Sequence, residues 1–366
     1  MALPKTTREY YLAEVGEFFL ADMFHTDSLV IGQIGTYENL KLREVPLTPP
    51  KSFEVLVKIH AVSLQYRDLV ISKGQYRVLP PPELVPCSDM AGEVIAIGED
   101  VKEWKKGDRV CANFAADHIH GDLTAEIQRT GHGGQIHGVL TQYKVFRPHS
   151  LVRIPDHLSF EEASTLPCAA LTAYNALWGP VPLKSGDTVL VLGTGGVSIF
   201  ALQFAVASGA TAIATSSSDE KLKIAQKLGA KHVINYKNHP DWDKKVLEVT
   251  NGRGVDHVIE VGGPGTLDKS MSAVRYHGWI HTIGFVSGHG SGQENVIRQS
   301  IAKAFSIRGI QIGSVAQFED MNRMIRANPD TTRPVIDKVF PFDEAIKAYA
   351  YLESQAHVGK LVIKVD

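Results

Sequence analysis

The sequence predicts an α/β protein with two domains, one rich in β-strands and one built on a doubly wound parallel sheet. Three observations support this prediction. The chain has 366 residues, which is enough for two domains of ordinary size. Short apolar segments bounded by turn residues dominate its first part. From about Ser159 the pattern changes to strands that alternate with helices, which requires parallel strands joined by crossover helices.

Strands are expected in the first part wherever β-branched and aliphatic residues follow one another between glycines. Residues 55–59 and 92–98 fit this pattern, and residues 107–110 enter a third strand from a turn. Residues 1–35 mix aromatic and acidic residues without a clean period, so we expect one strand and an irregular extension there.

A segment without strand or helix pattern covers residues 113–138. It holds four histidines, His118, His120, His132 and His137, together with five glycines. Long loops in compact domains are more often functional than not, so we expect this one to border an active-site cleft.

The second part begins with an expected helix over residues 159–177, where Ser159 is a candidate N-cap and Glu162 follows three residues later. The expected strands are 188–192, 211–214, 233–234 and 255–261, and the helices between them are 195–208, 220–228 and 242–250. The tail predicts a helix over 342–352 and a strand over 359–364, which we expect to return to the first domain.

Composition excludes several classes of protein. Hydrophobic residues make up 44% and charged residues 21%, as in an ordinary globular protein. The net charge of −2 gives no basis for binding nucleic acid or an acidic membrane surface. No segment approaches the roughly 20 apolar residues of a membrane span. Three cysteines without a CxxC motif indicate a reducing compartment, and no apolar signal segment follows Met1, so we expect a cytoplasmic protein.

The strongest local signal is a glycine-rich turn after the expected strand 188–192. Gly193 permits a tight turn, and Gly195 lets the backbone approach a pyrophosphate at the start of the next helix. Ser198 stands where the usual fingerprint has its third glycine, a position that requires a small residue. The turn comprises Gly193, Thr194, Gly195, Gly196 and Val197. The alternative is an ordinary strand–turn–helix connection.

The end of the second expected strand indicates which dinucleotide would bind. A site that prefers NAD carries an acid about 20 residues after the glycine turn. Here Ser216, Ser217 and Ser218 stand in that region, and Lys221 follows one turn later. Hydroxyls and an ammonium favour a 2′-phosphate that a carboxylate would repel, which points to NADPH. Alternatively the serines only cap the next helix, and both roles are compatible.

Several further segments have a characteristic order and spacing: residues 61–68, 88–94, 107–110, 166–174, 193–198, 228–230, 254–256 and 359–360, with Lys221. Together they resemble the medium-chain dehydrogenase/reductase superfamily, in particular its zinc-independent alcohol-dehydrogenase-like and quinone-oxidoreductase-like members. The resemblance covers nearly the whole chain after about residue 35. It implies a GroES-like catalytic domain over residues 1–157 and 315–366, a Rossmann NADP-binding domain over residues 158–314, and a cofactor between them.

The resemblance also bears on zinc. Zinc-dependent relatives supply a cysteine, a histidine and a second cysteine or acid, and these positions match Gln65, Ser88 (followed by Asp89) and Cys168. A single thiolate does not hold a catalytic zinc, which needs about three protein ligands. We therefore expect no metal and expect Cys168 to be a small buried residue. The alternative, an unrelated metal site in the histidine-containing loop, finds no support in the histidine spacing.

The resemblance implies that Gln65 and Tyr66 face the nicotinamide. Without a metal, a hydrogen-bond donor must stabilise the charge that grows on a carbonyl oxygen. Relatives often have asparagine where Gln65 stands, and Tyr66 either donates a hydrogen bond or only shapes the pocket. We expect Asp68 to fix the local backbone and Arg67 to be a surface or salt-bridge residue.

The resemblance assigns further residues to cofactor binding: Thr172, Tyr236, Val261, Gly262, Ile283, Gly284 and Phe285. For the glycines the alternative is turn geometry alone. It also favours a homodimer joined through edge strands near residues 280–285 and 305–312. The expected function is NADPH-dependent hydride transfer to or from a carbonyl or alcohol, or to a conjugated enone or quinone. A non-redox binding protein or pocket catalyst on the same fold is the alternative.

Overall fold

The computed structural model describes residues 3–13, 35–76, 80–286 and 293–365. These divide into two compact units, each described here by itself. The first unit comprises the described parts of Met1–Cys168, Gly313–Arg323 and Ile336–Asp366, and the second comprises those of Ala169–Ile312 and Met324–Val335. The sequence analysis expects boundaries at 157/158 and 314/315. The first unit extends to Cys168 because α3 (Phe160–Ala163) packs on β3 and β4 of its sheet.

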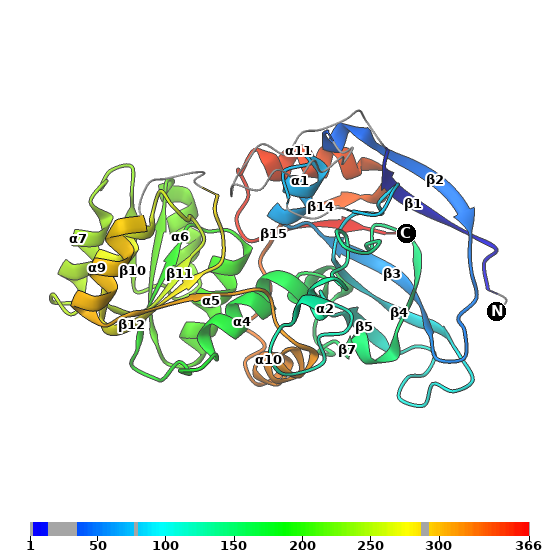
Figure 1. Ribbon diagram of the computed structural model, residues 1–366, viewed down its shortest axis with the longest axis horizontal. Helices are drawn as coiled ribbons and strands as arrows, with labels where there is room; N and C mark the ends of the chain where they lie inside the picture. The colour runs from blue at the N-terminus through cyan, green and yellow to red at the C-terminus, as the bar shows by residue number, and fades with distance from the viewer. Residues whose placement is uncertain (1–2, 14–34, 77–79, 287–292, 366) are drawn as a thin grey trace. The chain divides into compact units, whose positions relative to one another are not determined.

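The first unit is built around a mainly antiparallel sheet of seven strands (Figure 1). Its strands in spatial order are β14 (Ile336–Pro341), β15 (Lys360–Lys364), β3 (Val55–Ser63), β4 (Asp89–Ile97), β5 (Arg109–Ala112) and β7 (Leu151–Arg153), and β6 (Tyr143–Phe146) pairs with β3. The strand β15 pairs with β3, so the expected return of the last strand to this unit is confirmed. A separate antiparallel pair consists of β1 (Thr6–Leu12) and β2 (Leu40–Pro46), and residues 14–34 of the expected N-terminal extension lie outside the described residues.

The first unit also contains several short helices. The helix α1 (Tyr66–Ser72) begins three residues after β3, and α11 (Ala345–Glu353) packs on α1, β14 and β15. The short helix α2 (Ala125–Gln128) lies within the segment that was expected to be a loop, and α10 (Val315–Ala327) begins in the first unit and ends in the second. The main core cluster of this unit contains fully buried Val57, Ile59 and Met90.

The second unit contains a parallel sheet of six strands, drawn in green to orange in Figure 1. The spatial order is β10 (His232–Asn235), β9 (Thr211–Ser216), β8 (Thr188–Leu192), β11 (Val255–Glu260), β12 (Val274–Thr282) and β13 (Ser306–Gly309). The order reverses between β8 and β11, which is the Rossmann arrangement, so the predicted fold class is confirmed. The helices of the unit are α4 (Leu171–Leu177), α5 (Gly196–Ala207), α6 (Asp219–Lys227), α7 (Trp242–Val249), α8 (Leu267–Ala273) and α9 (Gln293–Lys303).

The expected single helix over residues 159–177 is wrong, although its start is correct. Ser159 Oγ accepts a hydrogen bond from Glu162 N, and the Glu162 carboxylate accepts one from Ser159 N. The α3 helix then ends at Ala163, a π-helical turn covers Leu166–Ala170, and α4 follows. Pro167 lies in that turn, and because proline has no N–H it cannot continue the regular hydrogen-bond ladder.

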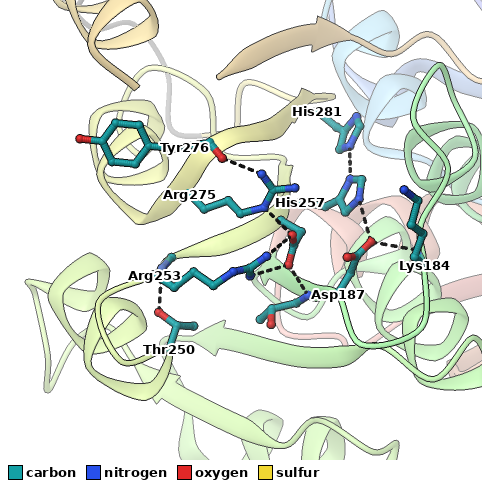
Figure 2. A network of polar contacts seen from close by, with 11 residues as sticks. Lys184, Asp187, Thr250, Arg253, His257, Arg275, Tyr276 and His281 are labelled. Carbon is teal, nitrogen blue, oxygen red and sulfur yellow. Dashed lines mark hydrogen bonds and ion pairs between the residues drawn. The ribbon is translucent and has the colours of Figure 1, made fainter. Parts of the chain in front are cut away.

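A buried carboxylate links the N-terminal ends of three strands in the second unit, in the network of polar contacts that Figure 2 shows. Asp256 on β11 accepts hydrogen bonds from Thr188 N at 2.8 Å, from Arg253 at 2.7 and 2.9 Å, and from Arg275 Nε at 2.5 Å. These donors hold the pKa of Asp256 well below its usual range against the effect of burial. The network fixes β8 against β11, the two strands between which the sheet order reverses.

Among the described residues, no helix has the length and apolar character of a membrane span.

Candidate active site

The glycine turn after β8 has the geometry that a pyrophosphate needs. Gly193 has φ of +73°, a conformation that side chains disfavour, and Gly195 is the N-cap of α5. A Cβ built on either glycine meets no atom within 4 Å, so space lies open in front of the turn. Ser198 Oγ donates to Leu192 O at 2.7 Å and ties the helix to the strand, which explains the serine at this position. The open turn and the unpaired N–H groups of a helix start fit a dinucleotide phosphate.

The end of β9 carries the serines that the sequence analysis assigned to the ribose. Ser216 is the last residue of the strand, and its buried hydroxyl accepts a hydrogen bond from Ser218 N. Ser218 is the N-cap of α6, since its Oγ accepts from Lys221 N, so the capping role is confirmed for that serine. Ser217 lies between them, directly after the end of β9.

Two acids that the sequence analysis did not consider begin α6. Asp219 Oδ1 accepts a hydrogen bond from Asn235 Nδ2 at 2.7 Å, and Glu220 Oε2 accepts one from Ser218 Oγ at 2.8 Å. Tyr236 follows β10 and is 41% exposed. The carboxyl ends of β9 and β10 therefore offer hydroxyl, ammonium and carboxylate groups within a short stretch of chain.

The ends of β11 and β12 complete the expected cofactor edge of the second unit. Fully buried Glu260 accepts hydrogen bonds from Gly262 N at 2.8 Å, Gly263 N at 2.9 Å and Thr266 Oγ1 at 2.6 Å, and also from the Ser270 hydroxyl. A Cβ on Gly284 would lie 2.5 Å from Val261 O, so only glycine lets these two turns approach. The turns carry the expected residues Val261, Gly262, Ile283, Gly284 and Phe285, whereas Thr172 is buried on α4.

In the first unit, Gln65 and Tyr66 stand at the start of α1. Gln65 is the N-cap, and its backbone N–H donates to Asp68 Oδ2 at 2.8 Å. Asp68 thus fixes the local backbone, as expected. Gln65 is buried, whereas Tyr66, the first residue of the helix, is 38% exposed.

The three positions that match zinc ligands in relatives meet on one carboxylate. Asp89 Oδ2 accepts hydrogen bonds from Gln65 Nε2 at 2.6 Å and from Cys168 N at 2.9 Å, and Oδ1 accepts from Ser88 Oγ at 2.5 Å. Burial raises the pKa of Asp89 to about 6, although the nearby Lys360 ammonium opposes this effect. Buried Lys360 donates to Leu64 O, and burial lowers its pKa. The sequence analysis gave Lys360 no role in the site, because 295 positions along the chain separate it from Gln65.

These side chains do not form a zinc-binding set. Gln65 turns its N–H toward Asp89, and Ser88 donates its hydroxyl to the same carboxylate. The expectation that Cys168 is buried is wrong for the residue as a whole, which is only partly buried, whereas burial of its thiol raises the pKa of that thiol well above its usual range. Zinc requires thiolates, imidazoles or free carboxylates arranged around one point. Elsewhere in the described chain, no three histidine, cysteine or acidic side chains are grouped to hold a metal.

The segment 113–138 is held against α1 by Arg67. The Arg67 guanidinium donates to His132 O at 2.8 Å and to Gln135 Oε1 at 2.9 Å, and it lies 4.6 Å from the ring centre of Phe114. The expectation that Arg67 is a surface or salt-bridge residue is therefore wrong, because its guanidinium donates hydrogen bonds to a backbone carbonyl and to a side-chain amide. His118 and His132 are buried, and burial lowers the pKa of His132 to about 3, so its ring is neutral.

Comparisons with known proteins identify relatives of both parts of the chain. A model of the alcohol dehydrogenase GroES-like domain matches residues 51–156, and a model described as zinc-binding dehydrogenase matches residues 196–327. A zinc-type alcohol dehydrogenase-like protein of Schizosaccharomyces pombe is 48% identical over 92% of this chain and 99% of its own length. Human quinone oxidoreductase is 28% identical over 90% of this chain and 95% of its own. A solved Sinorhizobium meliloti protein described as an alcohol dehydrogenase is 36% identical over the full length of both chains, with a TM-score of 0.85.

Proposed function

Because the chain belongs to the medium-chain dehydrogenase/reductase superfamily, we propose that it is an NADPH-dependent oxidoreductase that acts on small carbonyl or conjugated compounds without a catalytic zinc. The observation that carries this proposal is the open turn at residues 193–197, which lies where the sheet order reverses. Relatives named alcohol dehydrogenase and quinone oxidoreductase support the substrate class.

Several residues would hold the cofactor. The N–H groups at the start of α5 would bind the pyrophosphate, and Ser216, Ser217 and Lys221 would bind the 2′-phosphate, with Tyr236 beside the ribose. Ser216 supports NADPH over NADH because it occupies the end of β9, where an NAD site carries its acid. The carboxylates of Asp219 and Glu220 already accept hydrogen bonds from Asn235 and Ser218. Thr172 and the turns 261–262 and 283–285 would contact the rest of the cofactor.

For this reaction the protein has to orient the substrate and the cofactor and to donate a hydrogen bond to the substrate oxygen. Bound NADPH would supply a hydride, and one proton from the Tyr66 hydroxyl or from water would complete the reduction of a C=O bond to an alcohol or of an activated C=C bond to its saturated form. We propose that the Gln65 amide and the Tyr66 hydroxyl donate hydrogen bonds to the substrate oxygen, on which negative charge grows. The same donors serve the reverse reaction, alcohol oxidation.

The proposed assembly is a homodimer. Of the two segments considered for it, residues 280–282 belong to β12, which is paired on both sides, whereas β13 forms the edge of the described sheet. Residues 305–312 therefore remain the candidate contact, with Ile307 on β13 37% exposed.

The first test is NADPH consumption with a conjugated aromatic enal, followed by identification of the product. A saturated aldehyde would establish C=C reduction, and an allylic alcohol would establish carbonyl reduction. Tight NADPH binding without turnover, across a panel of enals, ketones and quinones, would contradict the proposed redox function.

A further inference from the structure

We propose that Asp89 is a positioning residue that holds the Gln65 amide in place for the reduction, with Lys360 as its buried counter-ion. This inference rests on the proposed function, because it assigns a role to Gln65 in that reaction. It concerns the position that corresponds to the metal site of zinc-dependent relatives, where this chain places a set of donors that all face one carboxylate.

Asp89 receives hydrogen bonds from three different parts of the first unit. Gln65 precedes α1, Ser88 precedes β4, and Cys168 lies in the π-helical turn. Asp89 itself is fully buried at the first position of β4. An ionised carboxylate only accepts hydrogen bonds, so Gln65 must present its NH₂ group to Asp89 and not its carbonyl oxygen. The orientation of the amide therefore follows from the chemistry of its partner.

The consequence is a donor of fixed direction. A primary amide is planar and has two N–H groups. One N–H of Gln65 is committed to Asp89 at 2.6 Å, which leaves the second N–H for a substrate oxygen. Asp68 holds the backbone N–H of the same residue at 2.8 Å. Because both ends of Gln65 are held by carboxylates, the remaining N–H is oriented before substrate arrives, which is how a donor stabilises developing charge efficiently.

The positive charge of Lys360 offsets the cost of burying the negative charge of Asp89. A buried ionised carboxylate without a nearby positive charge is strongly unfavourable. Lys360 is the first residue of β15, its side chain is buried, and its ammonium binds Leu64 O, directly before Gln65. Its positive charge lowers the pKa of both Asp89 and Asp68, against the effect of burial. The chain thus supplies a buried cation directly beside the residue whose amide binds Asp89.

The test is a double-mutant cycle on kcat with the conjugated aromatic enal and NADPH. Asp89→Asn removes the acceptor-only partner at nearly constant volume. In the wild-type background we expect kcat to fall at least tenfold while the Kd for NADPH stays within twofold, since the cofactor residues belong to the other unit. In the Gln65→Ala background we expect the same change to alter kcat less than twofold, because the amide that Asp89 positions is gone. Asp108→Asn is the control for loss of a buried carboxylate, since Asp108 pairs with Lys105 and Arg153.

A second pair of variants keeps the proposal testable if Asp89→Asn does not fold. Lys360→Met should lower kcat, and Lys360→Arg should restore most of it, because only the second variant keeps the charge. An equal loss of kcat from Asp89→Asn with and without Gln65 would overturn the inference, as would equal activity of the two Lys360 variants. Absence of turnover in the wild-type protein would instead contradict the proposed function, so the two failures are distinguishable.

Discussion

The rings of His257 and His281 share one hydrogen bond, with 3.1 Å between Nδ1 of His257 and Nε2 of His281 (Figure 2). They lie on the neighbouring strands β11 and β12 and are nearly parallel, with ring centres 5.4 Å apart. His257 Nε2 lies 3.7 Å from Asp187 Oδ2, which accepts a hydrogen bond from Lys184 N. Burial lowers the pKa of both histidines, that of His281 to about 3. The pair is therefore neutral, with one ring donating and the other accepting.

This pair predicts that acid destabilises the second unit. A histidine whose folded pKa is depressed is neutral when folded but becomes protonated in the unfolded chain below its unfolded pKa of about 6.5. Stability is therefore lost as pH falls below 6.5, down to the folded pKa near 3 for His281. At pH 5.5 the loss from His281 is about 1 kcal/mol. The measurement is denaturant unfolding of wild type and His281→Gln at pH 7.5 and 5.5.

The comparison with His281→Gln isolates this effect from opposing ones. Asp68 and Asp89 have raised pKa values, to about 7 and 6, so their contribution to stability increases as pH falls through that range. Glutamine stays neutral at both pH values. When the pH falls from 7.5 to 5.5, the free energy of unfolding should therefore fall by about 1 kcal/mol more in the wild type than in the variant. A gap that is the same at both pH values would show that His281 does not titrate as described.

Replacement of Gly195 by alanine should weaken NADPH binding without unfolding the protein. The new methyl group meets no protein atom within 4 Å, and the extended φ of −73° suits any residue. The methyl would occupy the space through which the pyrophosphate approaches, so we expect the Kd for NADPH to rise at least tenfold, about 1.4 kcal/mol. Gly309→Ala, which also meets open space, is the control and should bind NADPH normally. Titration calorimetry and thermal unfolding measure the two effects.

Ser216→Asp should reverse the preference between the two nicotinamide cofactors. A carboxylate at the end of β9 repels a 2′-phosphate but accepts hydrogen bonds from a ribose 2′-hydroxyl. We expect kcat/KM for NADPH to fall at least tenfold and that for NADH to stay constant or rise. Ser218→Asp adds the same charge two residues later and keeps a good N-cap residue for α6, so its effect should be smaller. An unchanged ratio in Ser216→Asp would contradict the assigned position of the 2′-phosphate.

Metal removal should leave activity intact. Dialysis against a strong zinc chelator is expected to change kcat by less than twofold, because Gln65, Ser88 and Cys168 are bound to Asp89. Elemental analysis of the purified protein should find far less than one zinc per chain. Loss of turnover on chelation, restored by zinc, would show that the donor set rearranges around a metal.

The sequence predicts the second unit well because its signals are local. The strand Thr188–Leu192, the turn at Gly193 and the helix that starts at Gly196 follow from consecutive residues, and each lies where it was expected. Local signals missed the interruption of the helix expected over residues 159–177, where residues 164–165 form a turn and Leu166–Ala170 a π-helical turn that contains Pro167.

The cluster around Gln65 could be predicted only in part. The family resemblance grouped Gln65, Ser88 and Cys168 as the positions that match zinc ligands in relatives. It gave Asp89 no role beyond its place after Ser88. The role of Lys360 depends on the pairing of β15 with β3, a contact between distant segments. The buried pair of His257 and His281 likewise depends on the register of β11 and β12, which periodicity does not specify.

The pairing of β15 with β3 also sets an order of events during synthesis. A ribosome makes the strands β1 to β7 first, then the entire six-stranded sheet, and only afterwards the strand that carries Lys360. Until that strand emerges, β3 lacks one neighbour, and Asp89 lacks the positive charge that compensates its own. All residues of the second unit are therefore synthesised before the first unit can be completed, because the first unit needs β15 to pair with β3.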